Sequence, residues 1–236
     1  AMRLYNGKPL INSVNGKQES MHSIFPLVKK YGGVVIALTL DEAGIPETPE
    51  GRLAVAKKIV ETAAQYGISK KDLVVDALVM TISACQEAAD VTLRSLQLIQ
   101  EQLGVHTSLG VSNISFGLPQ RETINAAFFT MALQCGLSAA IVNPNSDAMR
   151  RAYDAYCALS GIDQQCMDYI ARYSQQASDA APKTAGMEMT LAQAIISGLK
   201  ESAHSAAERE LQTKEPLAIV NESLIPALDR VGQDFE

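Results

Sequence analysis

Residues 33–42 read Gly-Val-Val-Ile-Ala-Leu-Thr-Leu-Asp-Glu, an apolar run without polar alternation that ends in two carboxylates. A strand of this kind is buried on both faces, which is typical of parallel sheets covered by helices. Four more segments have the same character and are also predicted as strands: residues 9–11, 73–75, 108–111 and 139–142. The first stretch is therefore one copy of a repeated unit.

Amphipathic segments separate these strands. Thr48-Pro49-Glu50 supplies an N-cap, a proline in the first turn and an early acid, and apolar residues then recur at helical spacing until Gly67. Residues 91–103 and 122–134 follow the same pattern, each closed by a glycine. The alternation predicts an α/β fold with about five β/α units, whereas a closed (β/α) barrel has eight. Either three units lie upstream or the sheet is open.

The composition changes near residue 175. Residues 175–186 are rich in Ser, Ala and Gln and contain Pro182, whereas apolar residues recur at helical spacing from Thr190 onward. We therefore expect three parts: a β/α portion at 1–175, a linker at 176–189 and a helical segment at 190–236.

Charge and composition exclude several functions. The 236 residues include 20 Lys and Arg against 26 Asp and Glu, and no Trp. Because nucleic-acid affinity rests on clustered positive charge, we expect no nucleic-acid partner. The absence of an apolar run of about 20 residues argues against a membrane partner. Four Cys without a C-x-x-C pair suggest a cytoplasmic protein with reduced thiols and no metal site.

A carboxylate or carboxamide follows each predicted strand: Asn12, Asp41, Asp76, Asn113 and Asn143. Asp and Asn are common in turns and N-caps, so each one alone requires no ligand. Ligands of β/α folds, however, bind at the carboxyl ends of the strands. A carboxylate there can accept two hydrogen bonds from the donor edge of a 2-amino-4-oxo pyrimidine ring, and carboxamides can serve its other ring atoms.

The most specific segment is Gly-Val-Ser-Asn-Ile-Ser-Phe-Gly-Leu-Pro-Gln-Arg at residues 110–121. Together with Asn12, Asp76 and Asn143, it resembles the pterin-binding methyltransferase barrel over about residues 7–170. That family includes methyltetrahydrofolate–corrinoid methyltransferases and the folate module of cobalamin-dependent methionine synthase. Residues 216–232 resemble the opening of the helical cap that precedes a cobalamin-binding domain.

The resemblance implies a partial TIM (β/α) barrel, about its last five units, followed by the start of the cap. It implies transfer of the methyl group of 5-methyltetrahydrofolate to cob(I)alamin, as in methionine synthesis from homocysteine. Asn113 would be the catalytic residue, hydrogen-bonded to the ring nitrogen that loses the methyl group. The pterin-binding residues implied are Asn12, Asp76, Gly110, Ser112, Asn113, Phe116, Arg121 and Asn143. No Asp-x-His-x-x-Gly motif occurs, so a corrinoid-binding domain or protein outside this chain would hold most of the cobalamin.

Two alternatives stay open. One is a dihydropteroate synthase-like pterin enzyme, although its Ser-x-Pro-Gly and Lys-x-Ser-Arg patterns are missing. The other is an inactive fragment that acts as an assembly partner, with the open edges of the barrel forming a homo-oligomer.

Overall fold

The computed structural model describes residues 2–178, 189–196 and 198–233. The chain divides into two compact units, Ala1–Arg172 and Tyr173–Glu236. Each unit has its own apolar core.

The first unit is built on one parallel sheet. Its strands are β1 (Leu10–Asn15), β2 (Val34–Leu38), β3 (Leu73–Asp76), β4 (His106–Gly110) and β5 (Ala139–Ile141). They are hydrogen-bonded in the order β1-β2-β3-β4-β5, and every neighbouring pair is parallel. Consecutive strands that pair in chain order are the arrangement of a (β/α) barrel. The predicted α/β fold with a partial barrel is therefore confirmed.

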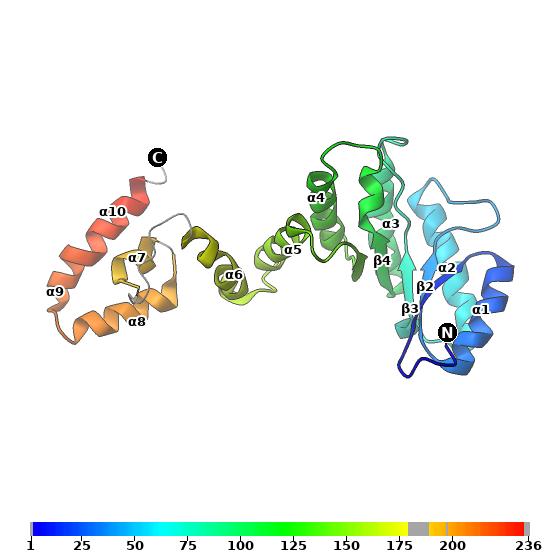
Figure 1. The fold of residues 1–236 in the computed structure, drawn as a ribbon, viewed down its shortest axis with the longest axis horizontal. Coiled ribbons are helices and arrows are strands. Elements are labelled where there is room, and N and C mark those ends of the chain that lie inside the picture. The colour runs from blue at the N-terminus through cyan, green and yellow to red at the C-terminus, as the bar shows by residue number, and fades with distance from the viewer. Residues whose placement is uncertain (1, 179–188, 197, 234–236) are drawn as a thin grey trace. The chain divides into compact units, whose positions relative to one another are not determined.

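Helices alternate with these strands, as Figure 1 shows by colour from blue at α1 to green at α4. They are α1 (Gln18–Tyr31), α2 (Pro49–Gln65), α3 (Ala88–Leu103), α4 (Arg121–Gln134) and α5 (Asp147–Leu159). A further helix, α6 (Met167–Ser178), follows α5 without a strand between them and extends past the end of the first unit at Arg172. The predicted cap of α2 forms, because Thr48 Oγ1 accepts a hydrogen bond from the Gly51 amide at 3.1 Å. Gly104 ends α3 in the left-handed region, with φ 60°.

Side chains alternate between the two faces of the sheet. One face packs against the helices in a single apolar core, to which the strands contribute Val14, Val35, Ala37, Leu73, Val75 and Leu109. The residues between them point to the opposite, inner face: Asn12, Ile36, Asp76, Ser108 and Gly110. Asp76 and Ser108 are direct neighbours in register there.

The first strand corrects one prediction. We placed Asn12 at the end of a strand over residues 9–11, but β1 continues to Asn15. The pairing with β2 shifts register between Asn12 and Val14, so one extra residue is inserted there. Asn12 is exposed while Val14 is fully buried against the helices, because the insertion puts these two residues on opposite faces.

The second unit is helical. It contains α7 (Leu191–Ile196), α8 (Lys200–Leu211), α9 (Pro216–Ile219), the π-helical turn η4 (Val220–Leu224) and α10 (Ile225–Gln233). Leu191, Ala206 and Ile219 form its buried core. Of the predicted linker, residues 179–188 lie outside the described residues. No helix in the described ranges has both the length and the apolar character that a membrane span needs.

Candidate functional site

Asp76 is the last residue of β3 and is only 7% exposed. Its Oδ1 accepts a hydrogen bond from the Leu78 amide at 2.8 Å. Its backbone carbonyl accepts two more from Thr39, one from the amide and one from the hydroxyl, both at 3.1 Å. Burial raises the pKa of Asp76 to about 6, against the lowering effects of the Leu78 amide and Arg52. The carboxyl group is thus fixed and poorly hydrated, and it keeps acceptor capacity toward the inner face.

Arg52 lies in the first turn of α2, and our sequence reasoning did not identify it. It is 2% exposed, and it donates to the backbone carbonyls of Pro46, Ala77 and Leu78 and to the Thr92 hydroxyl. A signal was present in the sequence: Arg52 falls on the same helical face as the buried residues of α2. A charged residue on an apolar face suggests a specific buried partner.

Gly110 and Asn113 meet at the end of β4. Asn113 lies in the short 3-10 turn η2 (Val111–Ser115), which follows the strand directly. A Cβ on Gly110 would lie 3.1 Å from Asn113 Nδ2. The Asn113 carboxamide therefore lies against the backbone of Gly110, in a space that a larger side chain at position 110 would partly occupy. Ser112 and Asn113 are both exposed in this turn.

The loops after β3 and β4 are tied to each other. The Ile82 amide donates to the Ile114 carbonyl at 3.0 Å. The Thr81 and Ser83 hydroxyls both donate to the Phe116 carbonyl, at 2.8 and 2.9 Å. These bonds hold the loop that carries Asn113 against the loop that follows Asp76. Phe116 itself is 67% exposed, so its ring remains available to a ligand.

Arg121 begins α4 and turns back onto its own loop. Its Nε donates to Ser115 Oγ at 3.0 Å, and its Nη2 donates to the Ser112 carbonyl at 2.6 Å. The guanidinium carbon lies 5.7 Å from the centroid of the Phe116 ring. In this structure the arginine therefore orders the loop that carries Asn113, and its implied contact with the pterin stays a prediction.

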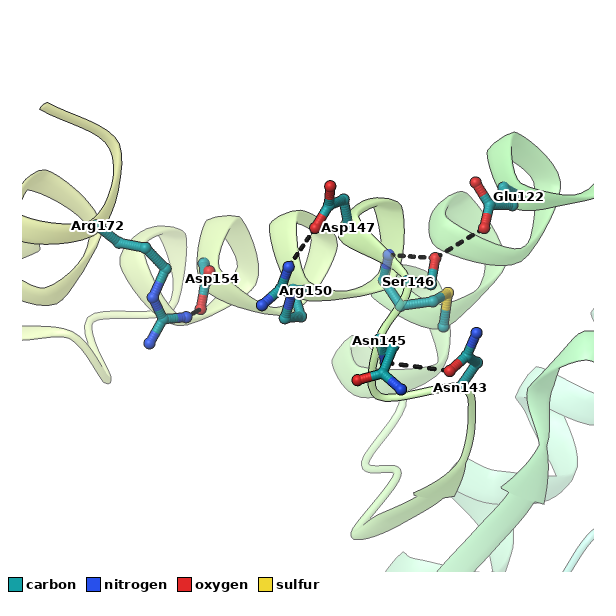
Figure 2. Close-up of polar contacts among 9 residues, drawn as sticks. Glu122, Asn143, Asn145, Ser146, Asp147, Arg150, Asp154 and Arg172 are labelled. Atoms are coloured by element: carbon teal, nitrogen blue, oxygen red, sulfur yellow. Dashed lines mark hydrogen bonds and ion pairs between the residues drawn. The ribbon is translucent and has the colours of Figure 1, made fainter. Parts of the chain in front are cut away.

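Asn143 lies two residues beyond β5, and its side chain organises that loop (Figure 2). Its Oδ1 accepts from the Asn145 amide at 3.1 Å, and nearby Ser146 Oγ donates to Glu122 Oε1 at 3.0 Å. A cavity of about 100 Å³ lies here, lined by Ser112, Glu122, Asn125, Val142, Asn143, Ser146 and Met149. Ser146 and Glu122 thus join the loop after β5 to α4.

The predicted residues occupy three levels of the structure: the carboxyl edge of the sheet, the inner face below it and the loops above it. Asp76 and Gly110 lie at the carboxyl edge of adjacent strands, with Asn113 directly beyond. Asn12 pairs with Ile36, two residues before Leu38, the partner of Asp76. At about 3.3 Å per residue, Asn12 lies roughly 7 Å deeper along the inner face. Ser112, Phe116, Arg121 and Asn143 occupy the loops above the edge.

Metal ligands were not expected, and the described residues contain no group of three or more His, Cys, Asp or Glu side chains able to hold a metal ion. The polar groups at and around the sheet edge are instead the Asp76 carboxylate, the Asn113 carboxamide directly beyond it, and the carboxamides of Asn12 below and Asn143 above. This set suits a neutral heterocycle with paired N–H donors.

Comparison with known proteins identifies the families that the two parts of the chain match. Residues 1–143 match the model of the pterin binding enzyme family. The chain belongs to this family. Residues 188–236 match a B12 binding domain model, so a pterin-binding enzyme portion is followed here by the start of a corrinoid-binding one.

Several proteins of known function are similar in sequence to this chain. A methylcorrinoid:tetrahydrofolate methyltransferase of Eubacterium limosum is 32% identical over 169 residues, which are 70% of this chain and 62% of that relative. Methionine synthases of Mycobacterium leprae and Mycobacterium tuberculosis are 28% and 27% identical, each over 97% of this chain. The chain spans only 22% of either methionine synthase.

Proposed function

We propose that this chain binds 5-methyltetrahydrofolate and transfers its methyl group to the cobalt of cob(I)alamin. The observation that carries the proposal is the juxtaposition of a buried, fixed carboxylate, Asp76, with the exposed carboxamide of Asn113 on the adjacent strand end. Asp76 would accept hydrogen bonds from the 2-amino group and the ring N–H of the pterin. Asn12, deeper on the same face, and Asn143, above it, would serve the remaining polar atoms.

The chemical role of Asn113 follows from the leaving group. In the transfer, the bond between N5 and the methyl carbon breaks, the carbon takes an electron pair from the acceptor, and N5 keeps its own pair and gains a proton. A tertiary amine leaves poorly unless N5 is protonated as this bond breaks. A carboxamide hydrogen-bonded to N5 stabilises the protonated state, while the proton itself comes from solvent or a hydrogen-bond network.

The corrinoid would be held chiefly by protein outside this chain. The helical unit at Tyr173–Glu236 supplies the start of that partner, in line with the B12 binding match. The two methionine synthases match across nearly the whole chain, including this unit. We therefore propose homocysteine as the final methyl acceptor, with the domain boundaries 1–175, 176–189 and 190–236.

A calorimetric titration of the chain with 5-methyltetrahydrofolate tests the binding step. We expect Asp76→Ala to abolish measurable binding, and Asn113→Ala to lower the rate of methyl transfer to added cob(I)alamin by about 100-fold or more. Lys57→Ala, an exposed change on α2, is the matched control. Unchanged binding in Asp76→Ala would contradict the assignment.

The inactive assembly fragment makes a different prediction. It requires the edges of β1 and β5 to pair with a second copy, so light scattering would find an oligomer, and titration would show no folate binding. A monomer that binds the folate supports the enzyme. A dihydropteroate synthase-like enzyme would bind a pterin without transferring the methyl group.

A further inference from the structure

Arg52 is a buried cation that forms no direct ion pair with any of the described residues. It is 2% exposed, and among the described residues no carboxylate lies within ion-pair distance of it. Burying a charge is costly unless hydrogen bonds replace the lost water. Burial lowers the pKa of Arg52, and Cys85 and Asp76 oppose that effect. The hydrogen bonds that Arg52 makes are therefore needed to offset its burial.

Those hydrogen bonds converge on the turn that follows Asp76. Arg52 Nη1 donates to the Ala77 carbonyl at 2.9 Å and to the Leu78 carbonyl at 2.7 Å. The Thr92 hydroxyl, on α3, lies 3.1 Å from the same Leu78 carbonyl. Arg52 Nε also donates to Pro46 in the loop after β2. One side chain thus connects the loops after β2 and β3.

Leu78 transmits this contact to Asp76. Its carbonyl is held by Arg52, while its amide donates to Asp76 Oδ1 at 2.8 Å. Leu78 has φ 62°, a left-handed conformation that costs an ordinary L residue free energy and persists only where the surroundings enforce it. The hydrogen bonds to its carbonyl supply that enforcement.

We propose that Arg52 is a positioning residue for the folate-binding carboxylate: by clamping the Leu78 carbonyl, it keeps the Leu78 amide on Asp76 Oδ1 and holds the carboxyl group toward the inner face. This proposal rests on the proposed function. It adds a residue that touches no substrate and acts through the backbone of the turn at 76–78.

The positive charge of Arg52 supports the same role, because it favours the ionised form of Asp76. Among the described residues, Arg52 from α2 lowers the pKa of Asp76, and Cys85, from the loop before α3, raises the pKa of Arg52. Removing the guanidinium therefore raises the pKa of Asp76 above its value of about 6. An ionised Asp76 is the form that accepts the two pterin hydrogen bonds.

The test uses the full chain with Arg52→Met, Arg52→Lys and Thr92→Val, and with Arg94→Met, an exposed arginine on α3, as the control. Carbon-13 NMR of the Asp76 carboxyl group gives its titration without ligand. Calorimetry gives the affinity for 5-methyltetrahydrofolate between about pH 5 and pH 8. We expect Arg52→Met to raise the Asp76 midpoint by about one pH unit and to weaken binding by about tenfold or more at neutral pH.

Arg52→Lys keeps the positive charge but loses the planar guanidinium whose N–H groups reach several carbonyls. We therefore expect weaker binding of 5-methyltetrahydrofolate, with a smaller change in the titration of Asp76 than in Arg52→Met. Thr92→Val loosens the Leu78 carbonyl with the guanidinium in place, and it remains informative if Arg52→Met does not fold. A purely structural role would lower the melting temperature and leave the titration and the pH midpoint of binding unchanged. That result in the folded variants would overturn the proposal.

The two proposals fail in distinguishable ways. If the unmodified chain does not bind 5-methyltetrahydrofolate, the proposed function fails, and the ligand-free titration still decides whether Arg52 acts on Asp76. If the unmodified chain binds and the Arg52 and Thr92 variants match Arg94→Met, the positioning role alone fails.

Discussion

Asn113 Nδ2 lies 3.1 Å from the position that a Cβ on Gly110 would take. The proposed catalytic carboxamide thus lies against a residue that has no side chain. Gly110 has φ −79° and ψ 82°, which other residues can adopt, so its role is space and not backbone freedom.

We expect Gly110→Ala to impair catalysis with little effect on stability. The added methyl group pushes the exposed Asn113 side chain by a few tenths of an ångström, and we expect methyl transfer to slow by about tenfold. The free energy of unfolding should change by less than about 1 kcal/mol, because the backbone conformation suits alanine. Single-turnover methyl transfer and urea unfolding measure the two effects. Equal rates for both proteins would contradict the placement of Asn113.

Asp76→Asn should stabilise the protein near neutral pH. The folded state raises the pKa of Asp76 to about 6, from an ordinary value of 3.8, because burial disfavours the ionised form. Protonation of this group therefore favours folding, and its contribution is lost as the pH rises from about 4 to about 6. The neutral amide avoids this loss, so we expect a gain of about 1–3 kcal/mol at pH 7, with folate binding abolished.

The difference in unfolding free energy between Asp76→Asn and the unmodified chain, measured from about pH 4 to pH 8, isolates this group from other carboxylates. It should grow as the pH rises. A difference that is flat with pH would show that the pKa of Asp76 is not raised.

Folate affinity should fall in acid. The protonated carboxyl group loses one acceptor, and with a pKa of about 6 in the free chain, only about a tenth of the protein is ionised at pH 5. We expect the dissociation constant to be about tenfold higher at pH 5 than at pH 7. Calorimetry in buffers of equal ionic strength checks this, and a constant affinity over that range would exclude an ionised Asp76 as the acceptor.

Thr81→Val should loosen the loop that carries Asn113. The substitution removes the hydroxyl that bonds to the Phe116 carbonyl at 2.8 Å and keeps the shape of the side chain. We expect a loss of about 1 kcal/mol and faster amide hydrogen exchange at residues 111–117. Ser146→Ala is the matched control, since it removes a cap of α5 at a similar cost but should leave that segment unchanged.

Much of the architecture was readable from the sequence. Continuous apolar runs ending in Asp or Asn indicated parallel strands, and the Thr48-Pro49-Glu50 cap predicted where α2 begins. These signals are local, because burial on both faces and helix capping depend on a few neighbouring residues. The motif at residues 110–121 likewise pointed to the family to which the chain belongs.

Tertiary structure decided the rest. The inserted residue that places Asn12 and Val14 on opposite faces depends on pairing with β2, which no local pattern in β1 predicts. The role of Arg52 depends on carbonyls at residues 46, 77 and 78, brought together only when two β/α units pack side by side. The sequence by itself indicated which residues to propose for pterin recognition. The packing of the strands and loops decided which carboxylate is buried, which carboxamide is exposed and what holds them, because burial and hydrogen-bond geometry arise between segments distant in the chain.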